Sequence, residues 1–494
     1  SRLIPQYDVI DDPALYYETH YRAMFNSKYY NGSSAAEAYA FADANLFNSA
    51  NGGLGYQVYT IPEGEKFIGT NFKLNPNATL GYSDGTYTYR PDDWYDETYH
   101  NSFRQEYNIS VNGQAERLSY YANVGYLDDG GTVNNSGFER YTARTNVEYQ
   151  AKDWLKLSTN LSFTSAESQS PAYGSTYGSS GNLFYITNSI APIYPLYVRD
   201  ADGNIMMENG RKVYDSNQTN FVRPTIVGNA VRDNEYNRYK GTNETFSGKW
   251  AATITPIEGL ILQATLSTTS ISSRSSSLYS RFGSATSVDG AVSVSSSRYF
   301  TVNQLYTANY HKTFADVHNF DILAGYEQYN VTSQSLSGYN DHLYSPFIGE
   351  LNNAHGTKNM DTGSSTAKYM TEGFFGRLQY DYAEKYFFNA SARRDASSRF
   401  APGNRWGTFG SLGAAWQLNK ESFLENEDWI DLLKFKVSWG SMGNDGISNA
   451  ASSYAPYADM YEVSYNEETG QYSTTMVQKG NNDLTWETNN QWNV

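Results

Sequence analysis

Residues that could do chemistry are scattered along the chain, and few of them stand in a catalytic spacing. "GYSDG", Gly81–Gly85, has the Gly-x-Ser-x-Gly spacing of a nucleophile elbow, in which the serine sits on a sharp turn between a strand and a helix. Here "TYTYR" follows, which predicts a strand or a loop in place of the helix. We therefore expect Ser83 to be a turn residue whose match arises by chance in a chain rich in Gly and Ser.

"RDADGN", Arg199–Asn204, places oxygen-bearing side chains at alternate positions, Asp200, Asp202 and Asn204. An EF-hand calcium loop begins in this way but requires Glu at its twelfth position, where this chain has Arg211. The sequence predicts a polar turn here and no cofactor. An irregular calcium-binding loop is the alternative that the spacing leaves open.

The remaining candidates for metal or acid–base chemistry show no known pattern. No two histidines stand in a His-x-x-x-His or His-Glu-x-x-His spacing. The chain has no cysteine, which excludes disulfides and thiolate ligands. Paired carboxylates for glycoside hydrolysis need a separation of roughly 5–9 Å in space, which sequence does not reveal. The histidines are His20, His100, His311, His318, His342 and His355.

Composition and charge narrow the class further. The chain has 494 residues, of which 16% are aromatic, including 45 Tyr, and its formal net charge is −16. An acidic surface repels phosphate backbones, so no nucleic acid is expected as a partner. So many aromatic residues argue against a disordered chain. Mean hydropathy is −0.63, and no stretch approaches the roughly 20 apolar residues of a membrane-spanning helix.

The elements that must position all these residues are strands. In "YTARTNVEYQAKDWLKLSTNLSF", 141–163, apolar and polar residues alternate on both sides of a short break, which is typical of two β-strands joined by a tight turn. The apolar set, predicted to share one face, is Tyr141, Ala143, Val147, Tyr149, Leu155, Leu157, Leu161 and Phe163. The polar set, predicted to share the other face, is Arg144, Asn146, Glu148, Lys156 and Asn160.

The same alternation recurs from residue 101 to the end of the chain and predicts about thirteen strands of about ten residues each. Turns of three to five residues close one end of the hairpins. Long loops are expected at the other end, at 166–244, 269–300, 331–369 and 442–483. Short turns on one side and long loops on the other are typical of a transmembrane antiparallel β-barrel, and a tilted strand of about ten residues crosses a bilayer. The predicted fold class is therefore all-β, a transmembrane barrel.

The cost of burying charge predicts which face meets lipid. Arg or Lys on the lipid face costs roughly 2–4 kcal/mol at the bilayer midplane, so the apolar set is expected to contact hydrocarbon and the polar set to line a wet lumen. Aromatic residues near the strand ends are expected to form girdles. A soluble β-sandwich shows the same alternation and is the alternative. The expected girdle residues are Tyr126, Tyr141, Tyr149, Phe163 and Tyr382.

Residues 1–100 have a different character. "DDPALYYETHYRAMFN" predicts a short helix with Asp11 or Asp12 as N-cap and Pro13 in its first turn, and "SSAAEAYAFADANLF" predicts another. We interpret 1–100 as an early insertion or loop region with short helices, and 101–494 as barrel strands with their loops.

Four stretches together resemble the SusC-like (SusC/RagA) branch of TonB-dependent outer-membrane transporters. They are "DDWYDETYHNSFRQEYNISVNG" (92–113), "RRDASSRFAPGNRWGTFGSLGAAWQLNKESFL" (393–424), "LLKFKVSWGSMGNDGIS" (432–448) and "NNDLTWETNNQWNV" (481–494). The second is the most specific. They stand in the family's order, so the resemblance covers nearly the whole chain.

This resemblance implies a bacterial outer-membrane protein with a 22-stranded barrel and an N-terminal plug. It implies import powered through TonB, a SusD-like lipoprotein partner that helps to capture glycans or peptides, and a dimer of transporter–lipoprotein pairs. The chain shows no plug and too few strands, starts at Ser1 and stops within a strand-like run, so we expect it to be an interior piece of the barrel.

The second stretch carries the candidate site residues, which the resemblance groups as one family-motif cluster at a loop or in the lumen. Arg393 has the polar parity of Asn389 and Ser391 and is expected to face the lumen. An Arg–Asp cluster at the outer end of this strand is expected to pin an extracellular loop by charge-assisted hydrogen bonds; a ligand-facing polar site is the alternative. The cluster comprises Arg393, Arg394, Asp395, Arg399, Arg405 and Trp406.

Three functions follow as hypotheses. The first is the barrel of a TonB-dependent nutrient importer for a glycan or oligopeptide, which makes and breaks no bond. The second is a secreted or surface β-rich carbohydrate-binding protein or adhesin. The third is a polysaccharide-degrading enzyme on a β-scaffold. Tyr-, Ser- and Asn-rich loops such as 170–189 and 335–347 suit sugar stacking and peptide contact equally.

Overall fold

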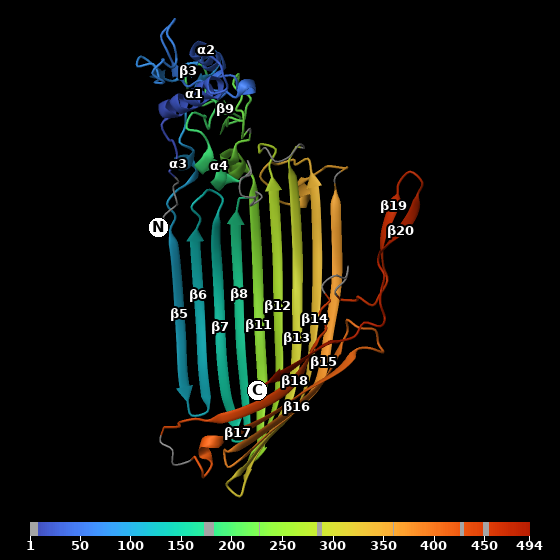
Figure 1. Ribbon diagram of the computed structural model, residues 1–494. Helices are drawn as coiled ribbons and strands as arrows, with labels where there is room; N and C mark the ends of the chain where they lie inside the picture. The colour runs from blue at the N-terminus through green and yellow to red at the C-terminus, as the bar shows by residue number, and fades with distance from the viewer. Residues whose placement is uncertain are drawn as a thin grey trace.

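A thirteen-stranded antiparallel sheet, here called the wall, dominates the computed structural model, which describes residues 8–171, 182–226, 228–283, 289–358, 360–424, 429–447 and 454–494 (Figure 1). Consecutive strands are neighbours throughout, as in a barrel built from hairpins. The predicted number of strands is confirmed. The strands are β5 (Arg104–Ala115), β6 (Leu118–Gly130), β7 (Gly137–Lys152), β8 (Leu155–Ser170), β11 (Arg238–Ile257), β12 (Leu260–Tyr279), β13 (Ala291–Phe314), β14 (His318–Asp341), β15 (Asp361–Tyr382), β16 (Tyr386–Ser397), β17 (Trp406–Gln417), β18 (Lys434–Asn444) and β21 (Glu487–Asn493).

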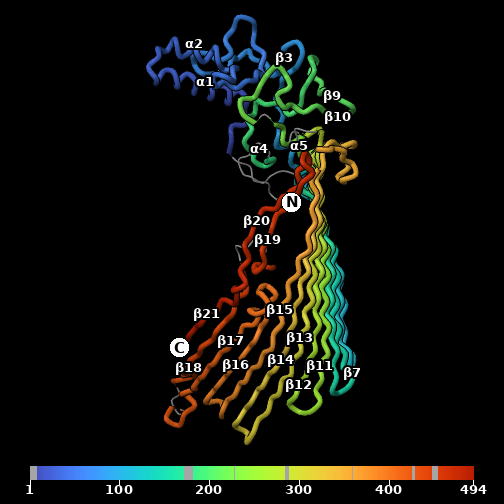
Figure 2. The backbone as a smooth tube through the Cα atoms, turned by 90° about the vertical axis from the view of Figure 1, so that its right-hand side faces the viewer, coloured from blue at the N-terminus to red at the C-terminus, as the bar shows by residue number. Residues whose placement is uncertain are grey.

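The wall is curved. Figure 2 shows the strands from β7 to β18 curling away from a flat plane, so that one face is concave and the other convex. Edge strands β5 and β21 are paired on one side only. The wall is therefore an open arc of antiparallel strands, as expected for part of a barrel.

The wall strands from β7 to β15 are longer than predicted, and two of the predicted loops are wrong. β13 and β14 each have 24 residues, so most of 269–300 and 331–369 is strand. These extensions are rich in serine, which carries no apolar signal. Their hydroxyls pair across strands, at 2.7 Å between Ser275 and Ser295 and 2.7 Å between Ser335 and Ser365, and the backbone ladder continues.

Tight turns close the lower end of the wall. The β13–β14 turn places Ala315 and Asp316 at φ of 50° and 56°, and the β15–β16 turn places Ala383 and Glu384 at 52° each. Successive left-handed residues form the hairpin turn whose twist matches that of the flanking strands. A longer connection with η3 (Leu418–Lys420) joins β17 to β18 at the same end.

A helical unit, here called the cap (8–103 and 182–237), sits at the opposite end and overhangs one side of the wall (Figure 2). Asp12 accepts the N–H of Ala14 at 2.9 Å and Pro13 begins α1, which confirms the predicted helix start. Tyr56 donates to Asp215 at 2.8 Å in its interior, so two chain segments build one core. Its elements are α1 (Pro13–Tyr29), α2 (Ala35–Asn45), η1 (Ser49–Asn51), β1 (Tyr59–Thr60), β2 (Thr79–Leu80), β3 (Tyr82–Ser83), β4 (Thr88–Tyr89), α3 (Trp94–Thr98), α4 (Leu183–Ser189), β9 (Met207–Glu208), β10 (Arg211–Lys212) and α5 (Ala230–Tyr236).

The cap is built from two segments, because the long connection between β8 and β11 packs with residues 8–103. The division of the chain at residue 100 stays a prediction. Other long connections carry η2 (Leu351–Asn353) and the hairpin β19 (Met460–Asn466) and β20 (Gln471–Gln478). Among the described residues, no helix combines the length and apolar character needed to cross a bilayer.

Candidate functional site: the two faces of the wall

The strand register places the two predicted residue sets on opposite faces of the wall. In an antiparallel sheet, directly opposed residues share a face. Ala143 opposes Phe163 and Tyr149 opposes Leu157, whereas Asn146 opposes Asn160. The shift in register after Gln150 leaves Leu155 on the side of Leu157. All eight apolar residues therefore share one face, the apolar face, and all five polar residues share the other, the polar face.

Aromatic rings form an upper row across the apolar face, on the side of the cap. Tyr126 lies 5.0 Å from Tyr141 between ring centroids. On the other half of the wall, Tyr326 lies 6.4 Å from Tyr306 and 5.0 Å from Phe374. Hydroxyls in this row donate to polar residues two positions closer to the cap, Tyr141 to Glu139 at 2.6 Å and Tyr306 to Gln304 at 3.2 Å.

A second, lower row lies near the tight turns. Tyr386 stands 6.2 Å from Tyr382 and 6.3 Å from Trp416. Both Tyr386 Oη and Trp416 Nε1 donate to Glu421, at 2.6 and 3.0 Å. Phe374 and Tyr382 mark the two rows on β15 and are eight residues apart, which is roughly 26 Å along a strand. An apolar band about 25 Å tall between aromatic girdles is the form of an outer-membrane barrel surface.

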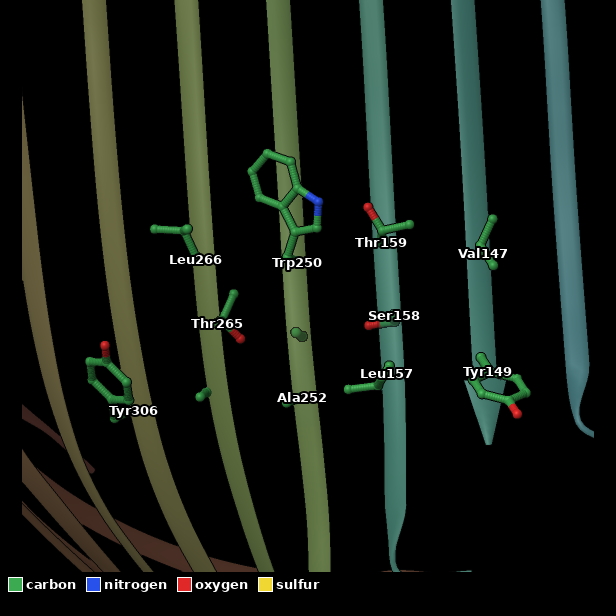
Figure 3. Close-up of a pocket in the computed structure, with 12 residues that line it drawn as sticks. Val147, Tyr149, Leu157, Ser158, Thr159, Trp250, Ala252, Thr265, Leu266 and Tyr306 are labelled. Carbon is green, nitrogen blue, oxygen red and sulfur yellow. The ribbon is translucent and has the colours of Figure 1, made fainter. Parts of the chain in front are cut away.

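Between the rows, the apolar face carries a shallow depression of about 470 Å³ (Figure 3). Trp250 and Tyr306 rise beside it, and small residues such as Ala252 and Thr159 form its floor. Its lining contains no charged side chain. A hollow of this kind offers neither an acid–base pair nor a charged anchor for a soluble ligand.

Arg393 organises the polar face near β14–β16. Its Nε donates to Asp395 Oδ1 and Oδ2 at 2.7 and 2.8 Å, and its terminal nitrogen donates to Glu327 Oε2 at 2.9 Å. The guanidinium also lies 5.3 Å from the Phe375 ring centroid. Gly373 opposes Asp395, and a Cβ there would come within 1.9 Å of Asp395 Oδ1. These contacts tie three adjacent strands together.

Arg399 belongs to a separate group, here called the latch (Tyr369, Ser397, Arg399, Asp445). Asp445 accepts hydrogen bonds from Ser397 Oγ at 2.6 Å and Tyr369 Oη at 2.7 Å, and it lies 3.3 Å from Arg399. Arg399 also stacks over the Tyr369 ring at 4.5 Å. Asp445 directly follows β18, so the latch holds the start of the long connection 445–486 against β15 and β16.

The prediction that Arg394 and Trp406 belong to the same cluster is wrong. Neighbours in a strand point to opposite faces, so Arg394 lies on the apolar face, opposite Phe374, and stacks over Trp406 at 5.2 Å. Arg405 donates to the Phe400 carbonyl at 3.0 Å and braces its own turn.

Sequence reasoning missed the acidic partners Glu327 and Asp445 and the latch tyrosine, Tyr369. Glu327 and Tyr369 lie in other strands, and only the strand register brings them near Arg393 and Arg399. Asp445 could have been identified from the sequence, because it lies inside the third family-like stretch, in "GNDG".

The two loop motifs are turns. Asp84 in "GYSDG" joins β3 to β4 and accepts the N–H of Tyr87 at 2.8 Å and the hydroxyl of Tyr89 at 2.7 Å; no helix follows Ser83. Asp200 accepts the N–H groups of Asp202 and Asn204 at 3.0 and 2.9 Å. Within the described ranges no group of three or more His, Cys, Asp or Glu residues is placed to hold a metal ion.

The comparison with protein families decides what the wall is. The family model described as "TonB dependent receptor-like, beta-barrel" matches residues 195–494, which is more than half of the chain. The chain belongs to this family. Members of this family are outer-membrane transporters and not enzymes, and the wall is part of such an outer-membrane barrel.

Individual relatives agree. The chain is 26% identical over 438 residues to TonB-dependent receptor P26 of Formosa agariphila, covering 84% of this chain and 40% of that protein. It is 26% identical over 424 residues to TonB-dependent receptor SusC of Bacteroides thetaiotaomicron, covering 81% and 40%. The chain thus spans about two fifths of the length of these relatives, and it is similar to SusC-like proteins as the sequence predicted.

Solved structures share the fold. The RagAB peptide transporter matches with a TM-score of 0.67 at 21% identity, covering 96% of this chain and 49% of that chain. The RagAB peptide importer in its closed-closed state matches with a TM-score of 0.64 at 23% identity, covering 82% and 43%.

Proposed function

We propose that the protein carrying this barrel imports a glycan or an oligopeptide across the outer membrane, driven through TonB. The single observation that carries the proposal is the family match along a wall whose apolar face is banded by two aromatic rows. Transport in this proposal needs no reacting groups. The wall supplies a passage, and the polar face supplies hydrogen-bonding groups along it.

The faces take their roles within this proposal. The apolar face, with Tyr141, Val147 and Leu161, contacts lipid, and the polar face, with Arg144 and Asn160, lines the lumen. The cap then stands on the extracellular side, because in outer-membrane barrels the short turns are periplasmic and the long loops extracellular. Its overhang (Figure 2) places it where a cargo would arrive.

Partners follow from the relatives. We propose that a SusD-like lipoprotein covers the extracellular mouth, that TonB acts through a plug domain, and that two transporter–lipoprotein pairs form a dimer. The relatives named SusC and RagAB support this arrangement. RagAB is named as a peptide importer, and the resemblance to the SusC-like family implies a glycan or a peptide, so both cargo classes stay in the proposal.

Uptake tests the proposal. A strain lacking the gene should lose accumulation of either a labelled oligosaccharide or a labelled oligopeptide, and the gene should restore it. Restoration should disappear when TonB is deleted. Equal accumulation of both compounds with and without the gene would contradict import. Recovery of the protein in buffer without detergent would instead favour a secreted carbohydrate-binding protein or adhesin.

A further inference from the structure

A row of aromatic rings crosses the seam between the cap and the wall. Tyr197, Tyr214 and Tyr236 belong to the cap, while Phe282 and Phe347 belong to the loops that follow β12 and β14. Successive ring centroids are 5.2, 6.2, 5.6 and 6.5 Å apart. Tyr197 and Tyr236 are buried, so the ring surface that a ligand could reach in this row includes that of Tyr214 and Phe347, which are partly exposed.

Cations lie at both ends of this aromatic row. The Arg211 guanidinium is sandwiched 4.5 Å from the Phe282 ring centroid and 4.4 Å from that of Phe347. Lys212 Nζ lies 4.4 Å above the Tyr197 ring. Stacking holds a guanidinium by its faces and leaves its in-plane N–H donors for a ligand. Arg211 has no carboxylate within 4 Å among the residues that the structure describes.

A pocket of about 400 Å³ opens on the same surface, and its lining carries more positive than negative side chains. Three cations, Arg211, Lys212 and Arg238, line it against two carboxylates, Glu97 and Glu235. Glu97 is already occupied, since it accepts the Tyr197 hydroxyl at 2.7 Å. The chain as a whole carries a net charge of −16, so a pocket with an excess of positive charge stands out.

One polar atom here lacks a partner. Arg238 Nε is buried without a hydrogen bond within the described part of the chain. A buried donor with no acceptor is costly, and an incoming anion would satisfy it. The unused Arg211 donors and Arg238 Nε therefore give two independent indications of the same ligand chemistry.

We propose that this seam pocket binds an oligosaccharide that carries an oxyanion, either a carboxylate or a sulfate ester. Arg211 and Arg238 bind the oxyanion by charge-assisted hydrogen bonds, which suit the planar guanidinium. Tyr214 and Phe347, whose rings are partly open to solvent, contact the sugar rings. The inference rests on the proposed import function for its role, in which it names an acidic glycan as the cargo class.

Calorimetric titration of the full-length protein in detergent tests the inference. The probes are a disaccharide ending in glucuronate, the same disaccharide ending in 6-sulfated glucose, and the neutral disaccharide ending in glucose. We expect at least one anionic probe to bind about tenfold or more tightly than the neutral probe. Equal affinity for all three, or an acidic dipeptide that binds as tightly as the sugars, would overturn the inference.

Variants locate the site. Arg211→Gln should remove about tenfold of the preference for the anion and leave affinity for the neutral probe unchanged. Lys212→Gln, at an exposed position, gives a second reading that does not depend on the stacked arginine. Arg274→Gln is the matched control, because Arg274 pairs with Glu350 at 2.8 Å outside the pocket and should leave binding unchanged. An unchanged preference in both pocket variants would contradict the assignment.

Binding is measured without transport, so the two proposals fail separately. Intact anion binding together with uptake that does not depend on the gene would refute import alone, whereas gene-dependent uptake without anion binding would refute only the seam pocket.

Discussion

Leu161 and Asn160 are neighbours on β8, and an arginine at each position tests which face of the wall meets lipid. On this strand, Leu157 opposes Tyr149 near the tight turn between β7 and β8, and Ser165 opposes Tyr141 of the upper row. Leu161 lies midway between them, which in the proposed orientation is the level of the bilayer midplane. Asn160 points to the polar face, opposite Asn146.

The two substitutions should differ by a large factor. Leu161→Arg places a guanidinium in hydrocarbon at the midplane, which costs roughly 2–4 kcal/mol, or about 30- to 700-fold in the folding equilibrium. Asn160→Arg joins a hydrated face that already carries Arg144 and Lys156, so its cost should stay within about 0.5 kcal/mol. Leu161→Gln separates loss of the leucine from burial of charge and should fall between the two.

Urea-dependent folding of the full-length protein into lipid vesicles, followed by tryptophan fluorescence, measures these costs. An equal dependence of the unfolding free energy on urea concentration among the variants would show that their folded and unfolded states are comparable with those of the wild type. A cost for Asn160→Arg equal to or above that of Leu161→Arg would refute the assignment of faces.

Three further outcomes are expected. Asp445→Ala removes the acceptor of the latch and should speed protease cleavage within 445–486. The control Lys479→Ala breaks an exposed ion pair in the same segment and should leave the cleavage rate unchanged. Equal cleavage rates in the two variants would contradict the role assigned to the latch. Gly373→Ala drives a Cβ into Asp395 and should destabilise the wall by about 1–3 kcal/mol in urea titrations, an expectation contradicted by wild-type stability. Burial raises the pKa of Asp84, but hydrogen bonds from its neighbours outweigh burial and lower the pKa to about 2. Asp84 therefore contributes roughly 1 kcal/mol to the stability of the cap, after allowance for its partial exposure. This contribution is complete above pH 3.8 and is lost as the pH falls through 2. Thermal unfolding should show that Asp84→Asn is less stable than the wild type above pH 3.8 and that this difference shrinks as the pH falls toward 2. A difference that does not depend on pH would contradict this role.

The alternation of side chains predicted the faces of the wall because hairpin pairing preserves parity. Tyr141 and Leu161 needed only the period of two, and the register then brought them to one side. The same period of two, applied to Arg393 and Arg394 as neighbours in one strand, is enough to place them on opposite faces.

The length of the strands and the structure of the cap could not be predicted from the sequence, for different reasons. The serine-rich extensions of β12 and β13 lack an apolar face, so alternation could not reveal them, although Ser275 and Ser295 pair across them. The cap depends on contacts across long sequence separations, such as that between Tyr56 and Asp215. No local pattern encodes such a contact, and the seam pocket depends on several of them.

A cysteine scan from 141 to 149 tests the central claim most directly, because this chain contains no cysteine of its own. Each single cysteine is labelled with a fluorophore in the full-length protein, and quenching is compared between brominated lipids and aqueous iodide. Odd positions, such as 143 and 147, should be quenched by lipid, and even positions, such as 144 and 146, by iodide. Uniform iodide quenching, or an inverted alternation, would contradict a wall with lipid on its apolar face and water on its polar face.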